Sequence, residues 1–524
     1  MNNYLDSEEK DIKGVVFMGK KINLVKLAIA SVFFASTTIL AAPKPLTVWI
    51  MPNGASPQEI LEKRLEIYSK KTGIPTKVEV LDWGEAWNRI CQALNGTQPA
   101  PDVLQLGTTW IPYFASRKEI KPLNADLAAI HPERFVPVSW NTTHIDEDTT
   151  IYSVPWFIDI RAVLANKRIL AEHGITADSV RTYEGFSKAI RKINEKNEIL
   201  DDGAHVRGYA FPGKNDWNIP HNFAPWIWSN GGSFIQKDSE GRWHANILSE
   251  ETLVGIANYL HFVMDSLVSP EALQMNTAQI AQRFNNGELG FIVNTSEIIM
   301  QTRIHGNQGG LSNARIGSDS IIVFPIPKGK NGSVSFIGGS NLAIPVNNKR
   351  KEAMDLLLFL VEDENLDAYT KQIGLLPPTR TVLKAWSEDE NYRVLVRALE
   401  TGKTYVAIPE WGELEQLLGS MFSTVWEQME IPSLYSEEKL YEIFKQYTIE
   451  IDKKLNYPTT NIMTAAEFKM AWNKINEENK PQVTPTPEDS TLGAVNDNIK
   501  KAPYVFIVVL ILGFLFAFLR KRKK

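Results

Sequence analysis

The stretch Leu46-Thr47-Val48-Trp49-Ile50 decides the class of fold, because a short apolar run followed by turn residues is typical of a buried strand. The turn is Pro52-Asn53-Gly54, and residues 57–71 then have the apolar spacing of a helix. The same order continues with a strand, a helix and a strand predicted at residues 76–81, 83–94 and 102–106. Strands that alternate with helices predict an α/β fold with a largely parallel sheet covered on both faces.

A second α/β region is predicted to begin near residues 152–156 and includes an aromatic segment at residues 217–228. Further helices are predicted at residues 183–197, 252–266, 351–362 and 365–372. Further strands are predicted at residues 290–293, 321–324 and 342–344. Because a chain of 524 residues is too long for one hydrophobic core, we expect two or more lobes.

Composition excludes several classes of function. The formal net charge of -5 offers no basic excess to neutralise phosphates, so we expect no nucleic-acid partner. Cys91 is the only cysteine, which excludes an intramolecular disulfide and a cysteine metal cluster. The eight histidines are scattered, and the chain has no zinc-protease motif, no nucleophile elbow and no phosphate-binding lysine loop. We therefore expect no cofactor and no metal.

Residues 1–42 are predicted to be a signal peptide with an N-terminal extension. The lysines Lys20, Lys21 and Lys26 precede an uncharged, mostly apolar run at residues 27–40, and two small alanines follow it. An uncleaved anchor helix is the alternative interpretation, and Met18 is an alternative start.

The C-terminal end has the pattern of a membrane anchor. Residues 502–519 carry no charge, and at about 1.5 Å per residue they would span roughly 27 Å, close to the thickness of a hydrocarbon core. The basic residues 520–524 predict a cytoplasmic C-terminus, and residues 481–501, with their prolines, predict an extended stalk. We expect a single-pass protein of the cell membrane whose large domain, residues 43–480, is extracytoplasmic.

Residues 45–475 resemble the family 1 extracellular solute-binding proteins, the maltodextrin- and multiple-sugar-binding type that serve ABC importers. Two of the landmarks are Tyr152-Ser153-Val154-Pro155-Trp156 and Gly338-Gly339-Ser340-Asn341-Leu342-Ala343-Ile344. The full set occurs in order at residues 46–49, 101–103, 106–107, 152–156, 230–232, 286–290, 325–327, 338–344, 374–377 and 408–411.

The resemblance implies a type II periplasmic-binding fold, with two lobes that close around a ligand by hinge bending. It places hinge crossings near residues 149–154 and 290–296. It further implies a sugar or oligosaccharide ligand and, as partners, the permease subunits of an ABC importer with their ATPase. Many relatives are free or held by an N-terminal lipid, so a C-terminal anchor would be a departure from the family.

Tryptophans are the first candidates for a sugar site, because sugars offer flat C–H faces to aromatic rings. In parallel sheets ligands bind at the carboxyl ends of strands, here the loops at Asn53, Trp83 and residues 108–110. The stacking candidates lie at such loops or where the chain enters a lobe: Trp83, Trp110, Trp156, Trp228 and Trp411. Packing in the core is expected instead for Trp49, Trp87 and Trp472.

Polar side chains are needed to bind sugar hydroxyls. Thr109 lies in the loop at residues 108–110, and the other candidates are Asn53, Asp159, Arg161, Asn230, Asn294 and Glu410. Gly339 and Ser340 could let the backbone approach the ligand closely, while a plain tight turn is the alternative for that segment.

Enzymatic alternatives fit the sequence less well. Glu413 and Glu415 are two positions apart on a predicted helix and would face apart, so a solvated helical face fits better than a glycosidase pair. The sequence predicts a binding protein and not an enzyme. A receptor coupled to a sensor partner remains an alternative, as do polyol, glycerophosphodiester and peptide ligands.

Overall fold

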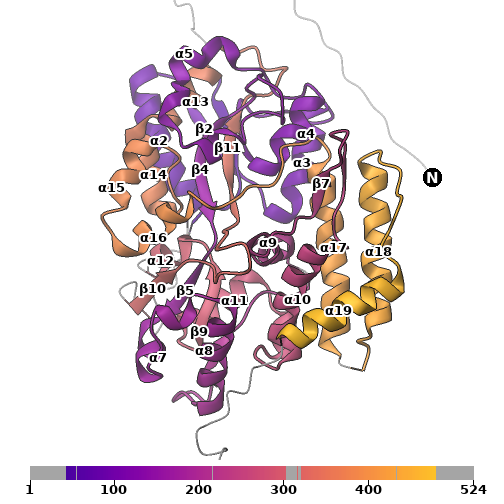
Figure 1. Ribbon diagram of the computed structural model, residues 1–524. Helices are drawn as coiled ribbons and strands as arrows, with labels where there is room; N and C mark the ends of the chain where they lie inside the picture. The colour runs from indigo at the N-terminus through magenta and orange to yellow at the C-terminus, as the bar shows by residue number, and fades with distance from the viewer. Residues whose placement is uncertain are drawn as a thin grey trace, which may run out of the picture.

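The computed structural model of the chain describes residues 43–479 apart from residues 55, 215, 303–315, 317–319 and 432 (Figure 1). The segments predicted as signal peptide, stalk, membrane helix and basic tail lie outside these described residues. Within the described part, no helix is both long enough and apolar enough to cross a membrane.

The first lobe is built on a five-stranded sheet with the order β2-β1-β3-β11-β4. Its strands are β1 (Leu46–Ile50), β2 (Thr76–Val80), β3 (Val103–Gly107), β4 (Val154–Ile160) and β11 (Ile337–Ala343). β1 pairs in parallel with β2 and β3, whereas β11 is antiparallel to both β3 and β4. The prediction of a largely parallel sheet is therefore confirmed for this lobe, with β11, which enters from the second lobe, as the one reversed strand.

Helices cover both faces of this sheet. Because successive side chains of a strand point to opposite faces, Val48 packs with α2 and α13 while Trp49 packs with α3 and α4. The helices of this lobe are α2 (Pro57–Thr72), α3 (Trp83–Leu94), α4 (Ile111–Ser116), α5 (Leu127–Ile130), α6 (Pro137–Trp140), α12 (Glu297–Gln301), α13 (Glu352–Val361), α14 (Asp363–Ile373) and α15 (Arg380–Trp386).

The second lobe has a four-stranded sheet with the order β10-β5-β9-β6. These strands are β5 (Ala162–Asn166), β6 (Arg207–Tyr209), β9 (Leu289–Asn294) and β10 (Ile321–Phe324), and only β6 and β9 are parallel. A small hairpin is formed by β7 (Ile235–Lys237) and β8 (Trp243–Ala245). The helices are α7 (Lys167–Glu172), α8 (Tyr183–Lys196), α9 (Ile219–Ser229), α10 (Glu250–Met264), α11 (Thr277–Asn285) and α16 (Glu390–Ala398).

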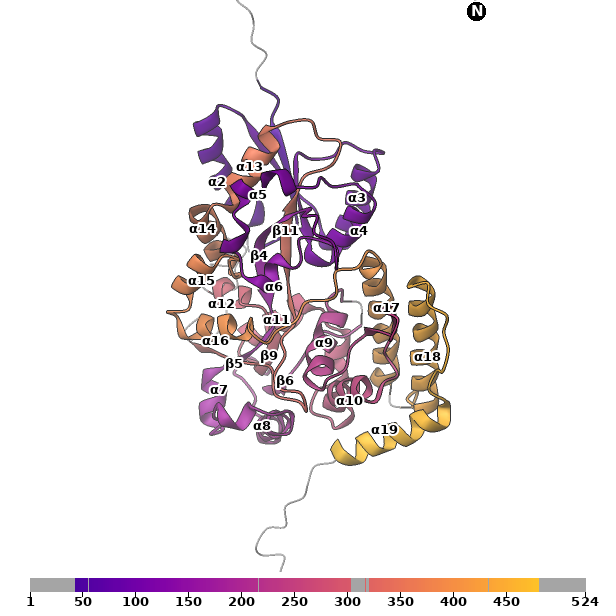
Figure 2. The same ribbon diagram turned by 45° about the horizontal axis from the view of Figure 1, so that its top comes forward.

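Three C-terminal helices extend the second lobe. In both views α17 (Trp411–Glu430) lies beside α9, and α19 (Ala465–Asn479) lies beside α10 (Figures 1 and 2). α18 (Glu437–Lys454) is outermost and packs on α17 and α19. α17 also reaches the first lobe, where it contacts α4 and the short 3-10 helix η1 (Thr108–Trp110). This long helix therefore spans the gap between the lobes.

The chain crosses between the lobes at least three times. It crosses at Arg161, between β4 and β5, at residues 295–296, between β9 and α12, and at residues 325–336, between β10 and β11. The crossing predicted within residues 290–296 is thus present. The crossing predicted at residues 149–154 is wrong, because β4 continues in the first sheet to Ile160.

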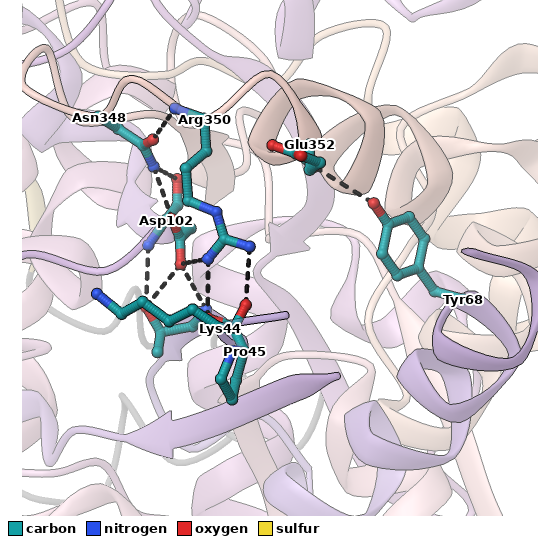
Figure 3. Close-up of polar contacts among 8 residues, drawn as sticks. Lys44, Pro45, Tyr68, Asp102, Asn348, Arg350 and Glu352 are labelled. Carbon is teal, nitrogen blue, oxygen red and sulfur yellow. Dashed lines mark hydrogen bonds and ion pairs between the residues drawn. The ribbon is translucent and has the colours of Figure 1, made fainter. Parts of the chain in front are cut away.

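A partly buried ionic cluster fixes the start of the described chain on the first lobe (Figure 3). Asp102 Oδ2 accepts a hydrogen bond from the backbone N–H of Thr47 at 2.8 Å, which fixes the start of β1. Arg350 donates to the carbonyl oxygens of Lys44 and Pro45, both at 2.9 Å, and its guanidinium lies 3.5 Å from Asp102 Oδ2. Segments about 250 residues apart in sequence are therefore joined where β1 and β3 begin.

Candidate functional site

A cavity of about 570 Å³ lies between the two lobes. Both lobes and the crossing segments contribute to its wall, including Trp83 from the first lobe, Trp217 from the second and Arg161 from a crossing. Its volume falls within the range of about 300–1,000 Å³ that is usual for small-molecule sites.

Tryptophans of the first lobe form one wall of this cavity. The carboxylate of Asp82 caps α3 by accepting from the Gly84 N–H, and Trp83 and Trp87 follow on one helical face, four residues apart. Trp110 meets both rings edge-on, with centroids at 5.9 Å from Trp83 and 5.3 Å from Trp87. Trp87 packs against the core of the first lobe, as predicted, but it also lines the cavity, which the sequence analysis did not predict; Trp49 and Trp472 are buried as expected.

Trp217 of the second lobe reaches across the cavity to this wall. Its ring stacks on Trp83 with a centroid distance of 5.5 Å and an angle of 16° between the planes, and 51% of the residue is exposed. The sequence analysis identified Trp217 only as the start of an aromatic segment. This stack is a direct contact between the lobes at the edge of the cavity.

A hydrogen-bonded amide network forms the floor of the cavity on the first lobe. Asn53 donates to Gln105 Oε1 at 2.9 Å, and Gln105 in turn donates to Ser340 Oγ at 2.8 Å. Tyr369 accepts a second hydrogen bond from Asn53 at 3.1 Å. Asn53 is therefore held in one orientation at the end of β1, with its position fixed before any ligand arrives.

The segment at Gly338-Gly339-Ser340 belongs to β11, so the alternative of a tight turn is wrong. Gly339 has a φ of +135°, and a Cβ there would lie 2.3 Å from the carbonyl oxygen of Phe157. Only glycine fits this close approach of two strands, next to an irregularity in the pairing of β11 with β4. The backbone at residues 338–340 consequently forms part of the cavity wall.

The crossing between β4 and β5 places a buried ion pair in the cavity wall. Arg161 Nη2 donates to Asn218 Oδ1 at 2.6 Å and lies 3.6 Å from Asp159 Oδ2. Burial raises the pKa of Asp159, and the Arg161 charge opposes that rise. The guanidinium is thus balanced by groups of the protein itself.

The second crossing contributes Asn294 and Glu297. Glu297 Oε1 accepts from the Gly54 N–H at 3.1 Å and from Gln301 Nε2 at 2.6 Å. Burial, with a smaller contribution from the nearby Asp159 charge, raises the pKa of Glu297 to about 7. The two crossings therefore bring two carboxyl groups with raised pKa to one side of the cavity.

Helix α17 closes the cavity from the C-terminal side. Glu413 forms an ion pair with Lys454 outside the cavity, whereas Glu415 lines the cavity and its Oε1 lies 3.6 Å from His221 Nε2. Burial raises the pKa of Glu415 to about 7, although the Thr109 hydroxyl opposes the shift. The expectation of a solvated helical face is therefore wrong for Glu415.

Nine of the fourteen predicted site residues line the cavity, and their contact with a ligand remains a proposal. They are Asn53, Trp83, Thr109, Trp110, Asp159, Arg161, Asn294, Gly339 and Ser340.

Trp156 lies in the core of the first lobe and not at the cavity, which corrects the prediction. It is fully buried and stacks on Tyr369 with centroids 4.4 Å apart. Its position follows from the alternation of β4, because the neighbouring Phe157 is the residue that lines the cavity.

The other four predicted residues lie outside the cavity wall. Trp228 and Trp411 are buried against Tyr405, and Asn230 is used internally, with its side chain donating to the Trp226 carbonyl oxygen at 2.8 Å. Glu410 directly precedes α17 and is not part of the cavity wall. The predictions for these four residues are therefore corrected.

Several lining residues were missed by sequence reasoning. They are Trp87, Trp217, Asn218, His221, Glu297, Phe336 and Glu415. The only available signal was the aromatic segment that begins at Trp217. In the described part of the chain, no group of three or more His, Cys, Asp or Glu residues could hold a metal ion.

Three relatives of this chain are proteins that bind saccharides or related compounds. The chain is 25% identical over 379 residues to the diacetylchitobiose binding protein DasA of Streptomyces coelicolor, covering 71% of this chain and 82% of that protein. The maltose-bound MalE3 of T. maritima superimposes with a TM-score of 0.66 at 18% identity, covering 78% of this chain and 99% of that chain. The GacH receptor of Streptomyces glaucescens gives a TM-score of 0.65 at 20% identity, covering 79% of this chain and all of that one.

These structural likenesses support the two-lobed periplasmic-binding fold. The family model of the bacterial extracellular solute-binding proteins matches residues 63–394, which include both sheets apart from β1 and most of the cavity wall. This agrees with the prediction of a binding protein and not an enzyme. The chain therefore belongs to the bacterial extracellular solute-binding protein family.

Proposed function

We propose that the chain is the solute-binding protein of an ABC importer and that it binds a sugar or an oligosaccharide in the cavity between its lobes. The observation that carries this proposal is the pairing of a tryptophan wall with fixed polar groups around one cavity of about 570 Å³. Sugars need both, because their C–H faces stack on rings while their hydroxyl groups require donors and acceptors.

Each part of the wall has its own role in this proposal. Trp83, Trp87 and Trp110 offer ring faces and edges to the sugar. Asn53 donates to Gln105 and Tyr369, so its Oδ1 is the atom that would accept a further hydrogen bond from a sugar hydroxyl. Asp159 and Asn294, each beside a crossing, would supply hydrogen bonds close to the hinge, so that ligand contacts favour the closed arrangement of the lobes.

The relatives support this choice of ligand class. One is named for diacetylchitobiose, one was solved with maltose, and GacH was solved with acarbose. These ligands differ in length and in linkage, so the specific saccharide has to be decided by the side chains of this cavity.

We further propose that the protein works while tethered to the cell membrane. The proposal rests on the apolar residues 502–519 and the basic residues 520–524. With the C-terminus in the cytoplasm, the two-lobed domain would lie outside the membrane, next to the permease that receives the ligand.

A thermal-shift screen of the full chain tests the ligand class. The panel includes monosaccharides, oligosaccharides, polyols, phosphodiesters and peptides, and a ligand at about 100 times its dissociation constant should add roughly 2.7 kcal/mol to the free energy of unfolding. We expect hits among the saccharides, recovered unchanged by chromatography after incubation. Shifts only with phosphodiesters or peptides, or hydrolysis of a bound saccharide, would contradict the proposal.

A further inference from the structure

The cavity wall is unevenly charged. Its carboxyl groups are Asp159, Glu297 and Glu415, and its only guanidinium or ammonium group among the described lining residues is that of Arg161. His221 also lines the cavity, but burial lowers its pKa well below the usual range, so its ring is uncharged at neutral pH. Acidic groups therefore outnumber basic ones around the ligand space.

Two of these carboxyl groups already have partners in the protein. Asp159 lies 3.6 Å from Arg161, and Glu297 accepts hydrogen bonds from Gln301 and from the Gly54 N–H. The one basic group is similarly occupied, because Arg161 donates to Asn218 at 2.6 Å. Among the described lining residues, Asp159 thus already balances the one cation, and no other cation remains to pair with an acidic ligand.

Among the described residues, Glu415 differs from Asp159 because no cation pairs with it, and from Glu297 because its own helix packs against the Trp87 ring. Among the residues that the structure describes, no Lys or Arg forms an ion pair with it, and its nearest basic group is the uncharged His221 ring at 3.6 Å. Its other polar neighbours, the side chains of Thr109 and Trp411, are uncharged, so none of them supplies a positive charge. A carboxylate without a cation in a partly buried wall is costly, and a positively charged ligand group would relieve that cost.

Aromatic rings lie beside this carboxyl group. Gly412, one helical turn before Glu415, approaches so closely that a Cβ there would lie 2.7 Å from the Trp87 ring. Trp87 in turn contacts Trp110. Tryptophan faces attract cations, so the rings and the carboxylate favour the same kind of ligand group.

We propose that the cavity selects saccharides that carry a protonated amine, with Glu415 as the residue that contacts the amine, and that it rejects acidic saccharides. This inference rests on the proposed function, because it names the class of saccharide for the same cavity. Glu415 is then a specificity-determining residue, whereas the tryptophan wall binds the sugar faces whatever their charge.

A matched series of β-1,4-linked disaccharides tests the proposal with the full chain by isothermal titration calorimetry at neutral pH. The series consists of cellobiose, its diamino analogue, the N-acetylated form of that analogue, and the corresponding uronic acid. We expect the diamino sugar to bind about tenfold more tightly than cellobiose, and the acidic sugar about tenfold more weakly. Equal affinity for the diamino and acidic sugars would overturn the proposal.

The substitution Glu415→Gln assigns the effect to one residue while keeping its shape. We expect it to remove most of the preference for the diamino sugar and to change the affinity for cellobiose by less than about threefold. Glu413→Gln, on the same helix but paired with Lys454 outside the cavity, is the control and should leave the whole series unchanged. Equal losses for cellobiose and the diamino sugar in Glu415→Gln would overturn the role of Glu415.

The outcomes separate this inference from the proposed function. If no saccharide in a wider panel binds, the proposed function fails. If neutral saccharides bind but the charge series is flat, the proposed function stands and the charge selection is wrong. Melting curves of both variants show whether they are folded, and the series on the unaltered chain remains decisive even if a variant is not.

Discussion

The gap between the lobes and the lobe cores use the same side chain, tryptophan, in opposite ways. In the first lobe Trp83, Trp87 and Trp110 lie in the cavity wall, while in the second lobe Trp226 and Trp228 are buried in the core. The difference depends on position relative to the gap between the lobes, and not on residue type or on local sequence. A tryptophan in this fold therefore contributes to stability or to binding according to which surface its element turns toward the other lobe.

The largest expected effect is the loss of stability when a tryptophan of the core is removed. Trp226→Ala removes a side chain that is 2% exposed and packs on Tyr259 and Phe262. We expect it to lower the free energy of unfolding by about 3–5 kcal/mol, measured by urea denaturation of the full chain. Trp83→Ala, in the partly open wall, should cost much less, and an equal loss in both variants would show that wall and core tryptophans do not differ in this way.

The next largest effect is the loss of ligand affinity when a tryptophan of the cavity wall is removed. Trp110→Ala is expected to weaken saccharide binding by about 1–3 kcal/mol through loss of ring contact, as measured by calorimetry with the best ligand of the screen. Trp226→Phe is the matched control, because it perturbs the core without touching the cavity. An unchanged dissociation constant in Trp110→Ala would remove Trp110 from the ligand site.

Glu297, beside the second crossing, should make the stability of the chain depend on pH, because its side chain titrates and an apolar core side chain does not. Glu297 has a pKa of about 7 in the folded chain, above its ordinary value near 4.5, so the folded state holds more protons than the unfolded state between these pH values. Stability of the unliganded chain should therefore be highest at the acidic end of this window and fall as the pH rises through it. After allowance for partial exposure, the loss is on the order of 1 kcal/mol.

The measurement is the midpoint of urea unfolding across this pH window, with Glu297→Gln as the test variant. The variant lacks the titrating group, so its pH profile should be flatter than that of the unaltered chain. Glu66→Gln, an exposed position on α2, is the control and should keep the original slope. An unaltered slope in Glu297→Gln would show that this carboxyl group does not titrate in the window.

The smallest expected effect concerns the contact that joins the two lobes. Trp217→Ala removes the stack on Trp83, which is worth roughly 0.5–1.5 kcal/mol beyond its buried area. We expect the unliganded chain to become more open, seen as a larger radius of gyration in small-angle scattering, while the ligand-saturated chain keeps its dimensions. Trp243→Ala, on the remote β7–β8 hairpin, should change neither value.

Sequence reasoning predicted the elements and the family well. The strands at Leu46–Ile50 and Ile321–Phe324 and the helix at Trp83–Leu94 have the predicted bounds, because their apolar runs are flanked by clear turn or capping residues. The family and the two-lobed fold are confirmed as well. Apolar runs and their flanking residues were sufficient to predict the bounds of these helices and strands.

The errors about site residues share one physical cause. The sequence of a single helix or strand does not show which of its faces lies opposite the other lobe. Trp156 and Phe157 are neighbours on β4, and the sequence does not indicate which of them faces the cavity. Glu413 and Glu415 similarly lie on the same helix, α17, and only the tertiary arrangement shows that Glu415 is enclosed by His221 of the second lobe and Thr109 of the first. Residues at the gap therefore need the tertiary arrangement to be identified.

The central claim, that a saccharide binds between the lobes, is tested most directly by hydrogen–deuterium exchange of the full chain with and without the best saccharide of the screen. We predict slower exchange at residues 107–110, 159–161 and 294–297, which line the cavity, and no change in α18 on the far side of the second lobe. Protection confined to α18 or to another surface, with these three segments unchanged, would contradict a binding site between the lobes.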